Sequence, residues 1–179
     1  MGQPELQDSH ASGQSKVGDM NLELEDGLKI DRGVLVLGCG NKTYKGATNH
    51  DLDRYTPDVD VAWDLNEAVW PIKDDKYWLI IAEDVVEHLD DFIHFFNECW
   101  RILQADCRLI VQVPRWDSEN TWRDPTHKRG YHVDCFKYLD PDTYWGNRYG
   151  MYTGKKWRIV DLRDGDNILA VLTPRKGEK

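Results

Sequence analysis

A short turn of small residues follows an apolar run at residues 34–37, whose length suits a strand buried on both faces. The turn is Gly38-Cys39-Gly40, where backbone N–H groups can come close to a ligand. A second extended segment, residues 47–53, ends in the acids Asp51 and Asp53. A glycine turn after one strand and an acid after the next are typical of nucleoside sites, because the acid accepts hydrogen bonds from a ribose. We therefore expect a nucleoside to bind here.

Two common nucleotide motifs are absent. A dinucleotide fingerprint has the form GxGxxG, but Thr43 stands where the third glycine is required. A phosphate loop, GxxxxGK followed by Ser or Thr, occurs nowhere in the chain. The turn therefore indicates neither a dinucleotide nor a nucleoside triphosphate.

The sequence LGCG at residues 37–40, with an acid after the next strand, resembles the first two motifs of class I S-adenosylmethionine-dependent methyltransferases. A small subgroup similar to type 11 methyltransferases has the pattern GCG…GxxNxD, matched here by Gly46, Asn49 and Asp51. The resemblance implies that S-adenosyl-L-methionine is the cofactor. Its amino-acid end would lie over residues 38–40, and its ribose would reach Asp51, with Leu52 beside it.

The same resemblance implies cofactor contacts after two later strands. Residues 57–65 alternate as a strand that ends in Asp64 and Leu65, where the family uses an Asp-Leu pair to contact adenine. Alternatively, Asp64 caps a helix at residues 66–69. The apolar run 77–82 predicts a buried strand with Glu83 and Asp84 at the ligand crevice. His88 is interpreted as a structural histidine under the cofactor.

An aromatic-rich insert, residues 114–155, leaves the last parallel strand where this architecture places its substrate crevice. Long loops of this composition are ordered and functional more often than disordered. Aromatic faces near the sulfonium would add cation–π attraction. The aromatic residues concerned are Trp116, Trp122, Tyr131, Phe136, Tyr138, Tyr144, Trp145, Tyr149 and Tyr152.

Within the insert, DPTHKR at residues 124–129 resembles a DPTHxR segment of the same subgroup. Methyl transfer to a hydroxyl or ring nitrogen requires a base for the acceptor proton, and histidine suits that role. We expect His127 to be this base, steadied by Asp124, and Arg129 to bind a polar or anionic group of the acceptor. Two alternatives stay open. Asp124 and His127 could instead lock the loop, or with His132 they could ligate a metal; the preferred interpretation includes no metal.

The elements that must position these residues alternate between strand and helix. A further strand is expected at 108–113, and strands at 156–162 and 168–173 should form a hairpin around Asp164-Gly165. One clear helix follows Asp90-Asp91, with an apolar stripe at Phe92, Phe95, Phe96, Cys99 and Leu103. The link between the first two strands is too short for a full crossover helix. We predict an α/β Rossmann-like, doubly wound, mostly parallel sheet with an antiparallel C-terminal hairpin, built as a three-layer αβα sandwich.

Composition limits the remaining possibilities. The chain has 179 residues and is 40% hydrophobic, which suits one domain, expected at 21–179 after a disordered leader at 1–20. Its 23 basic and 32 acidic residues give a net charge of −9, which disfavours a nucleic-acid partner. The four cysteines form no CxxC pair, so we expect reduced thiols and a cytoplasmic location. No apolar run approaches the roughly 20 residues of a membrane span.

The sequence therefore predicts an S-adenosylmethionine-dependent methyltransferase acting on an oxygen or nitrogen of a small molecule or glycan. One alternative is a nucleic-acid base methyltransferase, which would need a basic stripe formed by Lys42, Lys45, Lys128 and Arg129 beside the pocket. The other is a non-catalytic binding module whose aromatic insert grips a glycan or a protein.

Overall fold

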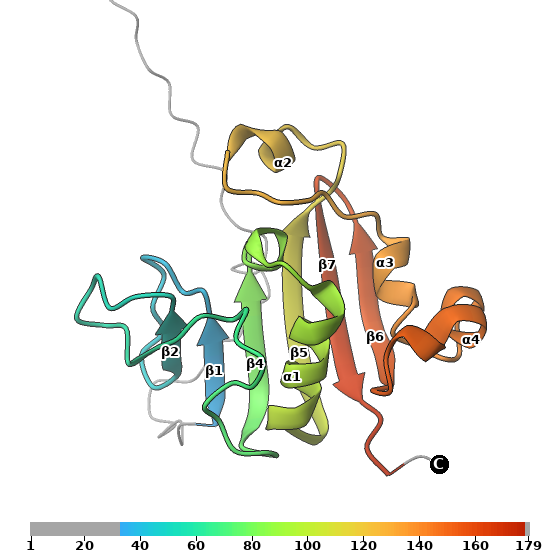
Figure 1. Cartoon of the computed structure of the whole chain (residues 1–179), viewed down its shortest axis with the longest axis horizontal. Coiled ribbons are helices and arrows are strands. Elements are labelled where there is room, and N and C mark those ends of the chain that lie inside the picture. The colour runs from blue at the N-terminus through green and yellow to red at the C-terminus, as the bar shows by residue number, and fades with distance from the viewer. Residues whose placement is uncertain (1–32, 178–179) are drawn as a thin grey trace, which may run out of the picture.

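Seven strands form one sheet in the order β3-β2-β1-β4-β5-β7-β6 (Figure 1). They are β1 (Val34–Leu37), β2 (Thr48–Asp51), β3 (Val61–Ala62), β4 (Tyr77–Glu83), β5 (Leu103–Pro114), β6 (Trp157–Asp164) and β7 (Asn167–Pro174). The first five strands are parallel, whereas β7 is antiparallel to both β5 and β6. The strand order reverses between β1 and β4, and such a switch point opens a ligand crevice at the carboxyl ends of the strands. This computed structural model describes residues 33–177, so the expected leader and the start of the domain lie outside the described residues.

The expected helix is α1 (Phe92–Ile102). The Asp91 carboxylate caps it by accepting a hydrogen bond from the His94 amide at 3.0 Å. The other helical segments are short: η2 (Val86–His88), α2 (Glu119–Arg123), α3 (Asp134–Lys137), α4 (Tyr144–Tyr149) and η3 (Gly150–Tyr152). Among residues 33–177, no helix is long and apolar enough to cross a membrane.

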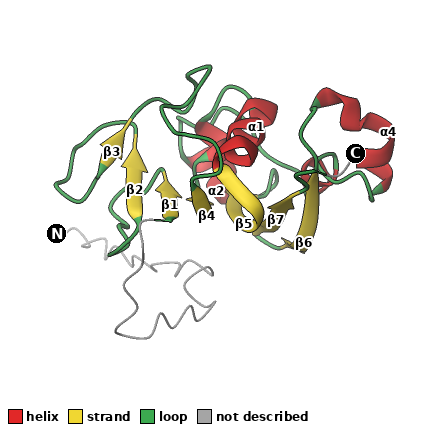
Figure 2. Cartoon of the chain, turned by 90° about the horizontal axis from the view of Figure 1, so that it is seen from below, coloured by secondary structure: helices red, strands yellow, loops and turns green. Residues whose placement is uncertain are grey.

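The helices α1 and α3 lie on one face of the sheet (Figure 1), and Figure 2 shows α1 on that face from below. The larger core cluster joins Phe95 and Phe96 of α1 and Phe136 of α3 to the strands. On the opposite face, a second cluster contains buried strand residues only: Val34, Leu79, Ile81, Ile110 and Leu169. Residues 33–177 thus form a sheet with one helical layer, whereas we predicted two, because the links from β1 to β2 and from β2 to β3 contain turns in place of helices.

Most predicted strands are confirmed, with different ends. β1 and β4 lie where the apolar runs indicated, and β6 and β7 form the predicted hairpin. β3 is only Val61–Ala62, much shorter than the segment 57–65. β5 begins at Leu103, directly after α1, so the loop expected before residue 108 belongs to the strand.

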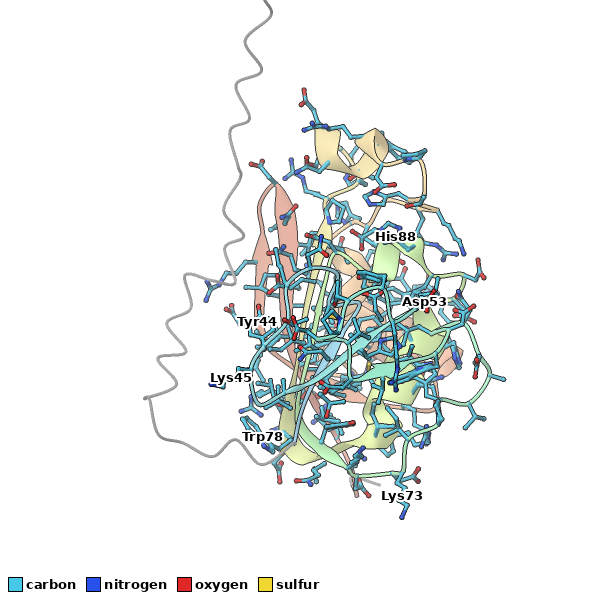
Figure 3. All side chains as sticks on the ribbon, turned by 90° about the vertical axis from the view of Figure 1, so that its left-hand side faces the viewer. Tyr44, Lys45, Asp53, Lys73, Trp78 and His88 are labelled. Atoms are coloured by element: carbon cyan, nitrogen blue, oxygen red, sulfur yellow. The ribbon has the colours of Figure 1, made fainter. Side chains whose placement is uncertain are left out.

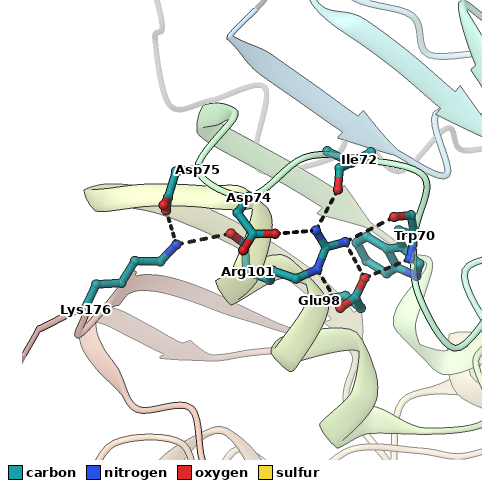
Figure 4. A network of polar contacts seen from close by, with 7 residues as sticks. All are labelled: Trp70, Ile72, Asp74, Asp75, Glu98, Arg101 and Lys176. Atoms are coloured by element: carbon teal, nitrogen blue, oxygen red, sulfur yellow. Dashed lines mark hydrogen bonds and ion pairs between the residues drawn. The ribbon is translucent and has the colours of Figure 1, made fainter.

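A polar network replaces a helix in the link between β3 and β4 (Figure 4). Arg101 of α1 donates to both carboxylate oxygens of Glu98, at 2.9 and 2.6 Å. The same guanidinium donates to the carbonyls of Ile72 at 2.6 Å and Trp70 at 3.1 Å. The Trp70 amide in turn donates to Glu98 Oε2 at 2.8 Å. These bonds hold the loop that carries Asp64 against α1.

Candidate cofactor site

The glycine turn after β1 requires glycine at its first position. Gly38 has φ +59°, and an added Cβ would lie 1.8 Å from Cγ2 of Val85. Gly40 also has a left-handed backbone, with φ +53°. The close contact with Val85 joins the end of β1 to the end of β4, the two strands on either side of the switch point.

Asp51 connects the end of β2 to this turn. Its Oδ2 accepts a hydrogen bond from the Gly40 amide at 2.8 Å, and its Oδ1 accepts one from the Leu52 amide at 2.7 Å. The Tyr55 hydroxyl also donates to Oδ2, at 2.9 Å. Tyr55 was not predicted, because an exposed tyrosine in a loop carries no signal in the sequence.

Two cavities share Gly38 as a lining residue. The first has a volume of about 410 Å³ and is lined by residues of β2, of the segments that follow β1, β2, β3 and β4, and of the insert: Gly38, His50, Asp51, Leu52, Trp63, Asp64, Leu65, Asn66, Val85, His88, Leu89, Thr126 and Lys128. The second has a volume of about 310 Å³ and includes Cys39, Gly40, Lys42, Glu83 and Asp84. We call the first the nucleoside pocket and the second the turn pocket. Every residue predicted to contact the cofactor lines one of them, whereas Asp53 lines neither.

His50 and Trp63 form a buried wall of the nucleoside pocket. Nε2 of His50 lies 3.0 Å from the Trp63 carbonyl, so this nitrogen carries the proton that the carbonyl accepts. The two rings are 3.7 Å apart between centroids. Burial lowers the pKa of His50 to about 4, so its side chain is neutral at pH 7. Sequence reasoning missed this histidine, although it lies in a strand that was predicted.

Asp64 follows β3 and lies at the edge of the nucleoside pocket. Its Oδ1 accepts hydrogen bonds from the backbone amide and the side-chain amide of Asn66, at 2.8 and 3.0 Å. Residues 66–69 form a turn and bends and no helix, so the alternative that Asp64 caps a helix there is wrong. Leu65 is buried, and its carbonyl accepts a hydrogen bond from Trp70 Nε1 at 3.1 Å.

The end of β4 carries unusual backbone geometry at the turn pocket. Asp84 has φ +52°, a left-handed conformation that side chains other than glycine adopt rarely. Its amide donates to the Gln112 carbonyl at 2.9 Å, which holds the strained residue beside β5. Glu83 Oε2 lies 3.6 Å from Nζ of Lys42. This arrangement places two carboxylates beside the glycine turn.

Known proteins resemble the chain in sequence and in fold. Over 129 residues it is 30% identical to proteins from two strains of Mycobacterium tuberculosis, each named a probable S-adenosylmethionine-dependent methyltransferase. The crystal structure of a SAM dependent methyltransferase from Archaeoglobus fulgidus matches with a TM-score of 0.55 at 15% identity, over 80% of this chain and 88% of that one. The fold is that of the class I S-adenosylmethionine-dependent methyltransferases.

The similarity in sequence has a limited extent. It covers 69% of this chain and 46% of each M. tuberculosis protein, so the chain spans less than half the length of these curated relatives. No family model matches the chain.

The DPTHKR segment joins this methyltransferase fold at η2, after β4, but not as predicted. Asp124 Oδ1 accepts hydrogen bonds from the amide and hydroxyl of Thr126, at 2.8 and 2.6 Å, and the Asp124 carbonyl accepts one from the His127 amide at 3.3 Å. Nδ1 of His127 lies 2.9 Å from the Thr121 carbonyl, and its Nε2 lies 3.8 Å from Oε1 of Glu87. The Asp124 carboxylate therefore orients Thr126 and not the His127 ring, and the backbone bonds of both residues fit the loop-lock alternative better.

Sequence reasoning also missed Glu87, which precedes the pocket-lining His88 in η2. Its side chain is fully buried, and burial, followed by the nearby Asp84 and Asp124, raises its pKa to about 8. Burial and the neighbouring His127 lower the pKa of His88. The triad Asp124, His127 and His132 is not formed, because His132 is exposed and its Nδ1 lies 3.5 Å from Asp134.

The basic residues of the methyltransferase fold do not form the stripe that a nucleic-acid substrate would need. Arg129 donates to the Asp90 carbonyl at 2.5 Å and lines neither the nucleoside pocket nor the turn pocket. Lys128 lines the nucleoside pocket, and its Nζ lies 2.6 Å from an Asp90 carboxylate oxygen. Lys42 lies at the turn pocket, while Lys45 and His88 lie on opposite sides of the sheet (Figure 3).

None of the aromatic residues of the insert lines the nucleoside pocket or the turn pocket. Tyr131 and Phe136 are buried in the main core. Tyr138 stacks on Trp145, with centroids 5.4 Å apart, and Tyr149 and Tyr152 continue the stack beside α4. Figure 1 shows α4 next to β6, at the opposite end of the sheet from β2. The insert thus supplies Thr126 and Lys128 to the nucleoside pocket, and none of its aromatic residues lines either cavity.

Proposed function

We propose that this chain is an S-adenosylmethionine-dependent methyltransferase whose cofactor lies across the glycine turn. The amino-acid end would occupy the turn pocket, and the ribose and adenine would occupy the nucleoside pocket. The observation that carries the proposal is that the two cavities share Gly38 and that every residue nominated from the sequence for cofactor binding lines one of them. A nucleoside with a long substituent needs two neighbouring sites of this kind.

The charges around the turn suit this cofactor. Its sulfonium and ammonium groups are cationic, and Glu83 and Asp84 line the turn pocket beside the glycines. Asp51 and Asp64 line the nucleoside pocket, where carboxylates can accept hydrogen bonds from ribose hydroxyls and from the adenine amino group. The pocket walls offer no glycine-rich loop of the kind that binds phosphates.

The acceptor we propose is a small molecule or glycan that carries a reactive oxygen or nitrogen. Methyl transfer is an in-line displacement, so the protein mainly orients the two reactants and excludes water. His127 is a poor candidate for the base, because its side chain is only 8% exposed and each ring nitrogen faces a protein oxygen. We therefore propose methyl transfer and name no residue as the base that removes the acceptor proton. Lys42 pairs with Glu83 and Lys128 pairs with Asp90, so these lysines do not favour a nucleic-acid substrate.

Calorimetric titration of the purified chain with S-adenosylhomocysteine tests the cofactor site. We expect one molecule to bind per chain with micromolar affinity. Asp64→Ala should weaken binding about tenfold through the loss of one charge-assisted hydrogen bond. Asp53→Ala is the matched control, because Asp53 is an exposed acid outside both cavities, and it should bind like the wild type. Absence of binding by the wild type would contradict the proposal.

Binding alone would not distinguish the enzyme from a binding module. The second measurement is therefore the release of S-adenosylhomocysteine from S-adenosylmethionine in the presence of candidate hydroxyl and amine acceptors. An enzyme should release product only when an acceptor is present. A chain that binds the cofactor but transfers no methyl group to any acceptor class would favour the binding module.

A further inference from the structure

Three potential metal ligands converge next to the nucleoside pocket. Glu87 and His88 come from η2, and His127 comes from the insert. One ligand atom from each of these residues lies within 4.8 Å of the others. The carboxylate of Glu87 is fully buried, and neither of its oxygens has a hydrogen-bond partner. A buried carboxylate without a partner carries a large desolvation cost, so this group calls for a ligand.

The hydrogen bond at Nδ1 of each imidazole determines whether its Nε2 can bind a metal ion. The Thr121 carbonyl can only accept, so Nδ1 of His127 carries its proton and Nε2 keeps its electron pair. Thr126 donates its hydroxyl proton to Asp124, so it accepts from Nδ1 of His88, 3.0 Å away. Nε2 of His88 is then also unprotonated. Metal-binding histidines are oriented in this way, with the other ring nitrogen donating to a carbonyl or to a group backed by a carboxylate.

We propose that Glu87, His88 and His127 bind a divalent transition-metal ion, for which Zn²⁺ is the best probe. Two imidazoles and one carboxylate suit Zn²⁺ and related ions, whereas Mg²⁺ and Ca²⁺ prefer oxygen ligands. Nε2 of His127 and Oε1 of Glu87 are 3.8 Å apart. Tetrahedral ligands around Zn²⁺ are roughly 3.3 Å apart for bonds of about 2.0 Å, so a small closure of the side chains brings these two atoms into place.

The position of the site suggests what the ion does. It would join the insert to η2, two segments already linked by the hydrogen bond from the Lys128 amide to the Glu87 carbonyl at 2.8 Å. His88 and Thr126 line the nucleoside pocket as well, so the ion would order the pocket wall that the insert supplies. The site stands on its own geometry and does not depend on the identity of the cofactor.

Titration with ZnCl₂ tests this site, after a chelator has removed bound metal from the purified chain. We expect one Zn²⁺ per chain with submicromolar affinity, measured by calorimetry and by elemental analysis after gel filtration. Asp124→Asn should weaken binding about 10- to 100-fold through the support of His88, and Glu87→Gln should weaken it further. His132→Asn is the matched control, because His132 is an exposed histidine of the same insert, and it should leave the affinity unchanged.

Spectroscopy of the wild type provides a readout that needs no variant. Co²⁺ in this site should give the intense visible absorption of a four-coordinate ion, and Zn²⁺ should displace it. Circular dichroism of each stripped variant shows whether it is folded before affinities are compared. The proposal is overturned if the folded wild type binds no Zn²⁺ at micromolar concentration, if Glu87→Gln binds as tightly as the wild type, or if His132→Asn loses the ion.

Discussion

The Gly40 amide donates a hydrogen bond to the Asp51 carboxylate at 2.8 Å, so the end of β2 holds the glycine turn in place. The same carboxylate oxygen accepts the Tyr55 hydroxyl at 2.9 Å. A bound ribose would need this acceptor too, so Tyr55 and the ribose share or compete for Asp51. The residue that shapes the turn is thus also the residue proposed to hold the sugar.

Variants of Asp51 and Tyr55 separate the role of the carboxylate from that of the tyrosine hydroxyl. Asp51→Ala should reduce the affinity for S-adenosylhomocysteine at least tenfold, about 1.4 kcal/mol, because it removes the ribose acceptor and frees the turn. Tyr55→Phe leaves the bond between Asp51 and Gly40 intact and removes only the competing donor, so its affinity should equal or exceed that of the wild type. Calorimetry on both variants makes the comparison. A loss of affinity in Tyr55→Phe equal to that in Asp51→Ala would show that Tyr55 itself contacts the cofactor.

Gly38→Ala tests the contact between the turn and β4. A Cβ at this position would overlap with Val85 at 1.8 Å and would have to adopt φ +59°. Overpacking together with a left-handed backbone should reduce the free energy of unfolding by about 3 kcal/mol. The matched control is Gly154→Ala, where no atom lies within 4 Å of an added Cβ, and the change should stay within about 0.5 kcal/mol. Urea unfolding of the two variants measures the difference, and equal stabilities would contradict the packing argument.

The buried His50 predicts that stability depends on pH. The pKa of this histidine is about 4 in the folded chain because of burial, whereas it is about 6.5 in an unfolded chain. Between these values the unfolded chain binds the proton and the folded chain does not, so the free energy of unfolding should fall as the pH drops from about 6.5 towards 4. The loss attributable to His50 reaches about 3 kcal/mol at the acidic end.

Urea unfolding at pH 7.5, 6 and 5, repeated on His50→Gln, isolates this contribution. The variant should be less stable than the wild type at pH 7.5, because it loses the ring contact with Trp63, but its stability should depend less on pH. The same pH slope in both chains would mean that other groups cause the acid sensitivity.

Arg101→Ala should destabilise the fold strongly. Glu98 is almost fully buried, and without Arg101 its charge loses its main partner, while the carbonyls of Trp70 and Ile72 lose their donor. Breaking a buried pair in this way should cost about 3 kcal/mol. Arg163→Ala is the control, because its ion pair with Asp161 at 2.7 Å lies on the surface, and its removal should cost less than about 1 kcal/mol. Thermal unfolding of the two variants measures the contrast, and equal costs would show that the network contributes no more than a surface ion pair.

Local sequence patterns were sufficient for most of the sheet. The apolar runs that became β1 and β4 are continuous because both faces of these strands are buried, and the Asp-Gly turn between two apolar segments predicted the terminal hairpin. β3 was overestimated because alternation at residues 57–65 continues into a loop. Further along this link, the polar network around Arg101 holds the carbonyls of Trp70 and Ile72, and no local pattern reveals these bonds.

In the candidate site, too, some residues could be predicted from the sequence and others could not. Gly38 and Asp51 could be predicted because a turn after one strand and an acid after the next are positioned by the strands themselves. The role of Asp124 could not, because its carboxylate turns to Thr126, two residues away, and its effect reaches His88 from another segment. Arg129 and Lys128 are neighbours in sequence, yet only Lys128 lines the nucleoside pocket.

The sequence by itself determined the strand framework, the glycine turn and the acids that flank it, because these depend on hydrophobic runs and on short spacings along the chain. The tertiary structure alone decided that Glu87 is buried with His88 and His127, that Tyr55 covers Asp51, and that the aromatic stack lies beside α4. The physical reason is that the packing of one loop against another sets these contacts. A polar residue in a loop reads the same in the sequence whether its side chain faces water or a buried partner.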